Sequence, residues 1–148
     1  MSDHAFENLS EGFKGLMSLK NLRIGFSETD PQDFTNKGVS AFCRAVKGLK
    51  NLTSLTFNLR NDNIDEEAVG EIAQMLREMP QLSEVWFSFG RCAKIKKKED
   101  ALESLFQAMK ELKNIRRLNL SIFSSLFNQK AVENLMLTKH VEISWQKF

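Results

Sequence analysis

The sequence predicts an α/β repeat fold, a right-handed superhelix of about five parallel strands backed by about five helices. The first observation is a register of eight apolar positions that recurs in four successive copies, at steps of 33, 30 and 33 residues. The second is that each copy passes from steps of three or four residues to strict alternation, which indicates a helix followed by a strand. A fixed period of this size is typical of stacked arrays in which neighbouring units bury one another's apolar faces.

The first unit shows the pattern in full. Its helix side carries the first four positions, a turn residue follows, and the strand side carries the last three: Phe6, Leu9, Phe13, Leu16, then Leu19, then Leu22, Ile24 and Phe26. The same positions run from Val39 to Leu59, from Val69 to Phe89 and from Leu102 to Ile122. The length differences between copies lie in the loop after the strand, where a stacked array tolerates insertions.

Polar residues predict where the next helices begin. Asp30-Pro31 interrupts the chain after the first strand, so the second helix is expected to begin near Thr35 or Asn36. Asp65, with two acidic residues after it, caps a third helix over Ala68–Met79, which Pro80 ends.

Glu99 and Asp100 start a fourth helix over 99–112. Gly70 inside the third helix costs about 1 kcal/mol relative to alanine; a glycine there allows close packing against a neighbouring helix, although nothing in the sequence requires it.

A shortened fifth unit closes the array. Val132, Leu135, Val141, Ile143 and Trp145 follow the register of the fourth copy at a distance of 23 residues, which predicts a short helix near 129–137 and a strand near 140–146. The whole chain is then one domain with units at about 5–30, 35–63, 65–93, 98–124 and 129–148. No polar cap follows the last strand, so we expect an open edge, or a fragment of a longer array.

The strand segments carry a recognisable signature. The second copy reads Leu52-x-x-Leu55-x-Phe57-x-Leu59, and the other three copies follow it with apolar replacements. This resembles the leucine-rich repeat, in the long ribonuclease-inhibitor-like subclass where a helix backs each strand. The stretch Leu49–Leu59, with Asn63–Ala68 after it, is similar to ciliate-type arrays. The resemblance implies a leucine-rich-repeat solenoid with parallel strands on a concave face, and recognition of a protein through that face.

Composition excludes several classes of function. The net charge of +2 among 27% charged residues gives no global field for nucleic acid or a membrane surface, so both are unlikely partners. The cysteines and histidines do not cluster at metal-ligand spacing, and no nucleophile motif or glycine-rich phosphate loop is present. We expect a non-enzyme without cofactor or metal. Two cysteines, no signal peptide and no long apolar stretch predict a cytoplasmic protein with free thiols.

The residues between the buried strand positions form the candidate binding site. Trp86 falls on the central strand among polar residues, which is the profile of an interface hot spot. The alternative is that Trp86 packs over Arg117 or Glu84 and binds nothing. The predicted partner-binding set is Arg23, Thr56, Asn58, Glu84, Trp86, Ser88, Arg117 and Asn119.

The segment Arg91–Lys98 is the one basic cluster, with Arg91, Lys94, Lys96, Lys97 and Lys98. One interpretation is a rim contact for an acidic partner. The other is a solvated loop balanced by Glu99, Asp100 and Glu103.

Two hypotheses of function follow. The first is a non-catalytic module that binds a protein partner, of unknown identity, through the concave face. The second is a structural subunit, or a self-associating module, that uses the open strand Val141–Trp145 and the convex helices. Trp86→Ala should abolish capture of the partner under the first hypothesis, and a charge at Ile143 should do so under the second.

Overall fold

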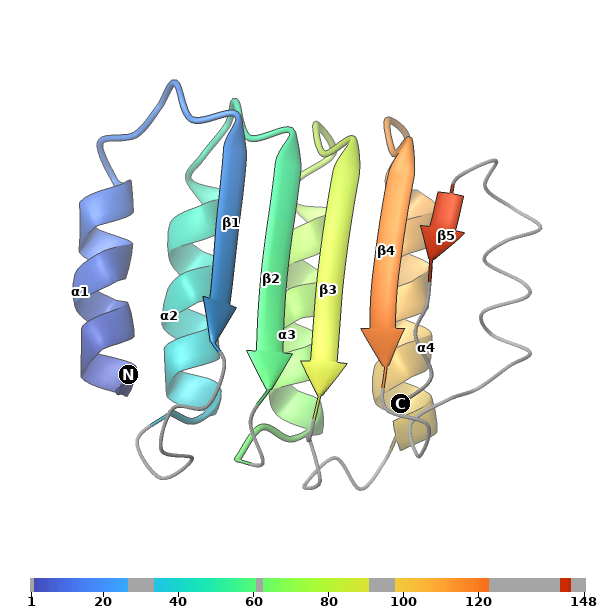
Figure 1. Ribbon diagram of the computed structural model, residues 1–148, viewed down its shortest axis with the longest axis horizontal. Helices are drawn as coiled ribbons and strands as arrows, with labels where there is room; N and C mark the ends of the chain where they lie inside the picture. The colour runs from blue at the N-terminus through green and yellow to red at the C-terminus, as the bar shows by residue number, and fades with distance from the viewer. Residues whose placement is uncertain (1, 27–33, 61–62, 91–97, 123–141, 145–148) are drawn as a thin grey trace.

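The molecule has two layers, a five-stranded parallel sheet and a row of helices that covers one of its faces (Figure 1). The computed structural model describes residues 2–26, 34–60, 63–90, 98–122 and 142–144. The elements, in chain order, are α1 (Asp3–Phe13), β1 (Asn21–Phe26), α2 (Asn36–Lys47), β2 (Ser54–Arg60), α3 (Glu66–Arg77), β3 (Glu84–Gly90), α4 (Lys98–Glu111), β4 (Arg117–Ile122) and β5 (Glu142–Ser144).

The sheet keeps the register of the sequence repeat. Each strand pairs in parallel with the next one along the chain, in the order β1-β2-β3-β4-β5. Leu22 lies opposite Leu55, Leu55 opposite Val85, and Val85 opposite Leu118, as the steps of 33, 30 and 33 residues require. The predicted α/β fold of parallel strands alternating with helices is therefore confirmed.

The helices begin at polar caps. Thr35 caps α2, as expected, and its hydroxyl accepts a hydrogen bond from the Lys37 backbone N–H. Asp65 caps α3, and its carboxylate accepts from the Glu67 backbone N–H at 2.9 Å. Because this bond draws the acidic residues into the first turn, α3 begins at Glu66, two residues before the predicted start.

The end of α3 also differs from the prediction. The helix ends at Arg77 instead of Met79, and a backbone bond from Met79 to the Leu76 carbonyl continues the chain as a turn. Gly70 makes no close helix contact, because a Cβ built there meets nothing within 4 Å. The close packing that a glycine allows is therefore not used at Gly70.

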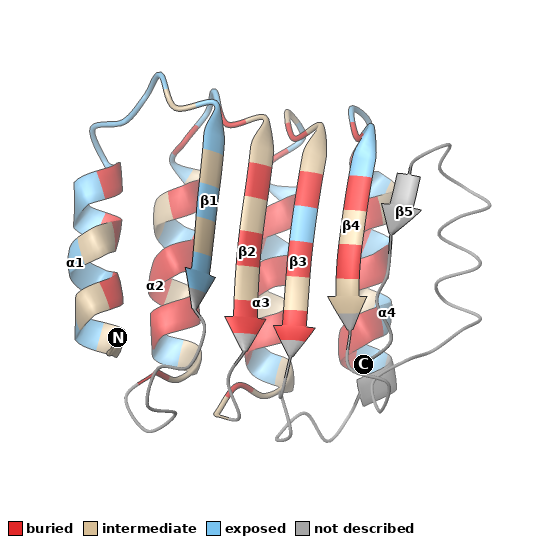
Figure 2. Cartoon of the chain, in the orientation of Figure 1, coloured by how far each residue is buried: buried red, intermediate tan, exposed pale blue. Residues whose placement is uncertain are grey.

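The apolar core lies between the layers. Strands β2 and β3 alternate buried residues with half-buried or exposed ones along their length (Figure 2). Phe42 of α2 stacks on Phe57 of β2 with ring centroids 4.2 Å apart, and Phe57 meets Phe87 edge to face. In the second to fourth copies, every register position whose side chain is described is at most 8% exposed. The repeat register is thus the core.

The predicted fifth unit is described only in its strand. β5 covers Glu142–Ser144 and pairs in parallel with β4, with Ile143 opposite Leu118. The helix expected near 129–137 and the rest of the strand expected near 140–146 lie outside the described residues. Within the part of the chain that the structure describes, no helix is long and apolar enough to cross a membrane.

Candidate functional site

One face of the sheet carries none of the described helices, and we call it the open sheet face (Figure 1). Because the strands are parallel and in register, the residues between the buried positions align in rows across them. The first row contains Arg23, Thr56, Trp86 and Asn119. The second row contains Gly25, Asn58, Ser88 and Ser121, and a third contains Asn21, Ser54, Glu84 and Arg117. The eight predicted partner-binding residues therefore lie on one surface.

Trp86 is the main apolar feature of this face. Its residue surface is 43% exposed, while Val85 and Phe87 on either side of it are buried. Thr56 and Asn119 lie opposite Trp86 on the neighbouring strands and are half-buried. The alternation of β3 explains the outward indole, because residues at period two point to the same side of a strand.

Glu84 and Arg117 form an ion pair beside Trp86. Arg117 Nη1 lies 3.0 Å from Glu84 Oε1 across β3 and β4, and the Ser54 hydroxyl donates to Glu84 Oε2 at 3.4 Å. The two side chains are 69% and 42% exposed, so the pair adds about 0–1 kcal/mol to stability. The pair therefore contributes little to the stability of the fold.

The open sheet face is hollowed around these groups. A hollow of about 600 Å³ lies over β1 to β4, between the Arg23 and Arg117 side chains. Its lining includes six of the predicted residues, Arg23, Thr56, Glu84, Trp86, Arg117 and Asn119, together with Ser54. Asn58 and Ser88 lie on the same face in the second row, outside this lining.

Asn58 brings an unsatisfied acceptor to the face. Its side-chain Oδ1 is buried and has no hydrogen-bond partner in the structure. Gly25 lies next to it, and a Cβ built at Gly25 would meet Asn58 Cβ at 3.7 Å. A buried acceptor without a donor costs about 1–3 kcal/mol, so an N–H or O–H group that reached Asn58 would recover part of that cost.

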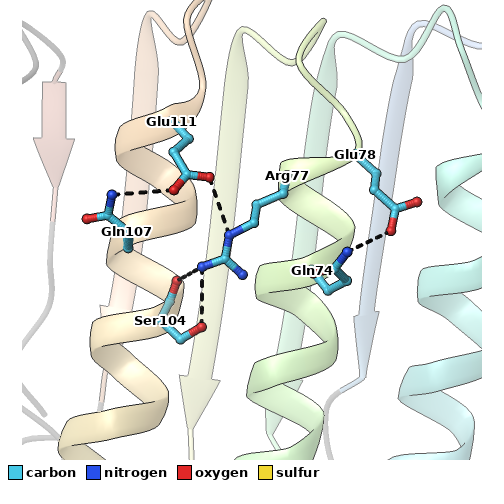
Figure 3. Close-up of polar contacts among 6 residues, drawn as sticks. All are labelled: Gln74, Arg77, Glu78, Ser104, Gln107 and Glu111. Atoms are coloured by element: carbon cyan, nitrogen blue, oxygen red, sulfur yellow. Dashed lines mark hydrogen bonds and ion pairs between the residues drawn. The ribbon is translucent and has the colours of Figure 1, made fainter.

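The outer side of the helix layer is polar and internally paired (Figure 3). Arg77 of α3 pairs with Glu111 of α4 at 3.3 Å and donates to the Ser104 carbonyl of the same helix. Glu78 accepts from Gln74 and from Lys47, and these two hydrogen bonds lower the pKa of the Glu78 carboxyl. The polar side chains on this outer side therefore satisfy one another's hydrogen bonds, whereas the Asn58 oxygen on the open sheet face has no partner.

The described cysteine and histidine, Cys43 and His4, do not line the hollow. Cys43 is buried in α2, and burial, followed by the nearby Glu71 carboxylate, raises the pKa of its thiol to about 12. His4 lies on α1 at 3.6 Å from Glu7. Among the described residues, no three His, Cys, Asp or Glu side chains come together in a way that could hold a metal ion.

The basic cluster is mostly outside the described residues. Arg91, Lys94, Lys96 and Lys97 fall there, and Lys98 is described only as the first residue of α4. The rim contact therefore stays a prediction.

Sequence reasoning overlooked a second hollow. It has a volume of about 350 Å³ and lies between α1 and α2, with Phe13 and Ala41 in its lining. Ser10 also lines it, and its hydroxyl is buried without a hydrogen-bond partner in the structure. A serine one residue after Leu9 carries no pattern of its own, so nothing in the sequence marks this hollow.

Comparison with known proteins supports the fold. The solved structure of "Leiomodin-1 Actin-Binding Site 2 (ABS2)" is similar to this chain with a TM-score of 0.64, over 93% of this chain and 73% of that one, at 16% sequence identity. At that identity the likeness shows the fold alone, which is an α/β repeat-like fold with a parallel sheet. No protein-family model matches the chain, and no curated protein matches it in sequence. The ribonuclease-inhibitor-like subclass stays a prediction.

Proposed function

We propose that this chain is a non-catalytic module of the leucine-rich-repeat type that binds a protein partner through the open sheet face. The observation that carries the proposal is Trp86, 43% exposed at the centre of a polar, hollowed surface. Tryptophans in such positions are enriched among the few residues that supply most of the binding energy of an interface. The neighbour of similar fold is by its name an actin-binding site, which agrees with a protein as the class of partner.

The polar groups around Trp86 support the same surface. Arg23, Glu84 and Arg117 line the hollow with charges of both signs, which favours a polar partner of matching charge order. The side-chain oxygen of Asn58, which is buried without a hydrogen-bond partner, lies in the next row. The partner is therefore expected to place an apolar side chain on Trp86 and a hydrogen-bond donor near Asn58.

The outer surface of the helices is a weaker candidate. Its polar side chains pair with one another between α3 and α4, so a partner would have to displace existing contacts there. The hypothesis of contacts through the C-terminal strand remains a separate proposal, which a charge at Ile143 tests. It predicts loss of assembly in that variant and an unchanged assembly in Trp86→Ala.

The test compares three purified proteins: the wild type, Trp86→Ala, and Gln107→Ala as a control on the exposed outer side of α4. Each is used to capture proteins from a native lysate, and actin filaments are tested separately by co-sedimentation. A partner found with the wild type is then purified and titrated calorimetrically. We expect Trp86→Ala to weaken binding by about 2 kcal/mol or more, roughly thirtyfold, with Gln107→Ala unchanged.

Equal affinity of the partner for wild type and Trp86→Ala would overturn the proposal. The thermal midpoint of each variant provides the folding control. Because Trp86 is exposed, its truncation should leave that midpoint close to the wild-type value.

A further inference from the structure

The apolar register is uncovered at the β1 end of the molecule. Leu16 is 45% exposed, while Leu49, Met79 and Leu112 occupy the same register position in the next three copies and are at most 2% exposed. Leu9, Leu19, Leu22 and Ile24 are only partly buried, whereas their equivalents in the second to fourth copies are buried. Met17, next to Leu16, is 51% exposed. These side chains form a surface that we call the β1-edge surface: Leu9, Leu16, Met17, Leu19, Leu22 and Ile24.

Within the described residues, the backbone of β1 is also unpaired on one side. β1 is the first strand in the order of the described sheet, and β2 is its one strand neighbour there. The Lys20 carbonyl accepts a hydrogen bond from the Ser54 N–H. Because alternate residues of a parallel strand bond to the same neighbour, the N–H and C=O groups of Leu22 and Ile24 also point toward β2. The N–H groups of Arg23 and Gly25 then point to the free side. Such a row of unpaired donors and acceptors is a template for another strand.

Helix α1 provides a floor beside this free edge. Figure 1 shows α1 at the end of the helix layer, displaced past β1 on the side away from β2. In the rest of the sheet, a strand lies over the helix layer and buries its apolar face. A strand added next to β1 would occupy the same relation to α1 and would cover the exposed part of the β1-edge surface.

The displaced helix decides what can bind. Two copies joined by antiparallel β1 strands would form one continuous sheet with both helix layers on the same side. Paired strands are about 4.8 Å apart, whereas packed helices need about 8–10 Å between their axes. Each α1 would therefore run into the helix layer of the other copy. A single extended segment has no helix layer and meets no such obstacle.

Charge adds a second requirement on the segment. Lys20 and Arg23 are exposed at the free edge, and neither side chain has a partner among the described residues. Arg23 points to the open sheet face, opposite to the apolar side of β1. An acidic residue on the outward face of the added strand would lie beside Arg23, and opposite charges on neighbouring strands are favourable.

We propose that the free edge of β1 binds an extended segment of a partner protein by strand addition. The segment alternates apolar side chains, which pack on the β1-edge surface above α1, with polar side chains that include an acidic residue beside Arg23. Hydrogen bonds to the backbone N–H and C=O groups of Arg23 and Gly25 provide the affinity, and the alternating side chains provide the selectivity.

The test selects short random peptides displayed on phage against the whole chain, and measures the enriched peptides by fluorescence polarisation. The first variant is Gly25→Pro, which removes one outward N–H. It should keep the fold, because proline is tolerated at edge positions whose N–H faces solvent, and a Cβ at Gly25 meets Asn58 Cβ at an ordinary 3.7 Å. The second variant is Leu16→Glu, which places a charge on the exposed apolar surface.

We expect the enriched peptides to alternate apolar and polar residues and to carry an acidic one. Their affinity should fall about tenfold or more in Gly25→Pro and in Leu16→Glu, and stay unchanged in Trp86→Ala. Should Gly25→Pro unfold, as judged by circular dichroism, Leu16→Glu decides alone.

Other outcomes overturn the proposal. Peptides that bind Gly25→Pro and Leu16→Glu as tightly as wild type would place the site elsewhere, and peptides lost only in Trp86→Ala would assign it to the open sheet face. No enrichment over a protein-free surface would also reject it. A dimer in sedimentation that Gly25→Pro converts to a monomer would make a second copy the occupant of the edge.

Discussion

The first unit and the three units after it carry the same eight-position apolar register but bury it to different extents. Leu49 is 1% exposed and Leu16 is 45% exposed, although both are leucines at the same register position. The difference lies in their neighbours, because each interior unit is packed between two others and β1 is the edge of the described sheet. Burial in a repeat array thus depends on the interfaces between units as much as on each unit's sequence.

The largest expected effect tests this comparison directly. Leu49→Ala removes a fully buried side chain and leaves a cavity, which should lower the free energy of unfolding by about 2–5 kcal/mol. Leu16→Ala changes the same residue type at the same register position, but half of the side chain already contacts water. We expect Leu16→Ala to lower the free energy of unfolding by less than about 1 kcal/mol, since substitutions at exposed positions usually have small effects on stability.

Urea unfolding of both variants, followed by circular dichroism, measures the two losses. Equal losses would show that Leu16 is covered in solution, which would also contradict the β1-edge surface.

A middle-sized effect is expected where the first unit joins the second. The Asp3 carboxylate in α1 accepts hydrogen bonds from the Thr35 N–H at 2.8 Å, the Gly38 N–H at 2.9 Å and the Thr35 hydroxyl at 2.7 Å. It thus caps α2 from a neighbouring helix, using both oxygens. Asp3→Ala should cost about 2 kcal/mol, because it removes hydrogen bonds to a charged group and takes the acceptor from the Thr35 N–H, while the Gly38 N–H keeps its bond to the Thr35 carbonyl.

Glu7 is exposed and lies one turn further along α1, so Glu7→Ala is the matched control. Thermal unfolding at neutral pH compares the two variants. An unchanged midpoint for Asp3→Ala would mean that the first unit contributes little to the cap of the second.

The smallest effect sharpens the comparison inside the interior units. Gly70 in α3 has free space around it, so Gly70→Ala should raise the free energy of unfolding by about 0.5–1 kcal/mol through the lower helix propensity of glycine. Gly38 in α2 is the opposite case, because a Cβ there would come within 2.4 Å of the buried Phe34 ring. Gly38→Ala should therefore destabilise the protein.

Chemical denaturation of the two glycine variants gives the signs. A stabilised Gly38→Ala would show that Phe34 moves aside at little cost, and a destabilised Gly70→Ala would reveal a contact at α3.

Parts of the candidate site could be anticipated from the chain alone. Alternation along β3 placed Trp86 on the polar side of the strand, and the repeat steps placed Thr56 and Asn119 beside it. The pairing of Glu84 with Arg117 could not be assigned, because side-chain direction selects one partner among several close neighbours. The sequence could not show that the Asn58 side-chain oxygen lacks a hydrogen-bond partner, because this depends on which donors lie near it in the folded sheet.

The chain alone specified the order of helices and strands, the parallel register and the apolar core of the interior units. These follow from periodicity, because a period near 3.6 and a period of two each allow one way of burying the apolar positions. Only the tertiary structure decided that the first copy of the register is partly exposed, that α1 extends past β1, and that Asp3 caps a helix in another unit. The physical reason is that burial and capping depend on neighbours distant in sequence, and a local pattern does not specify where the neighbours end.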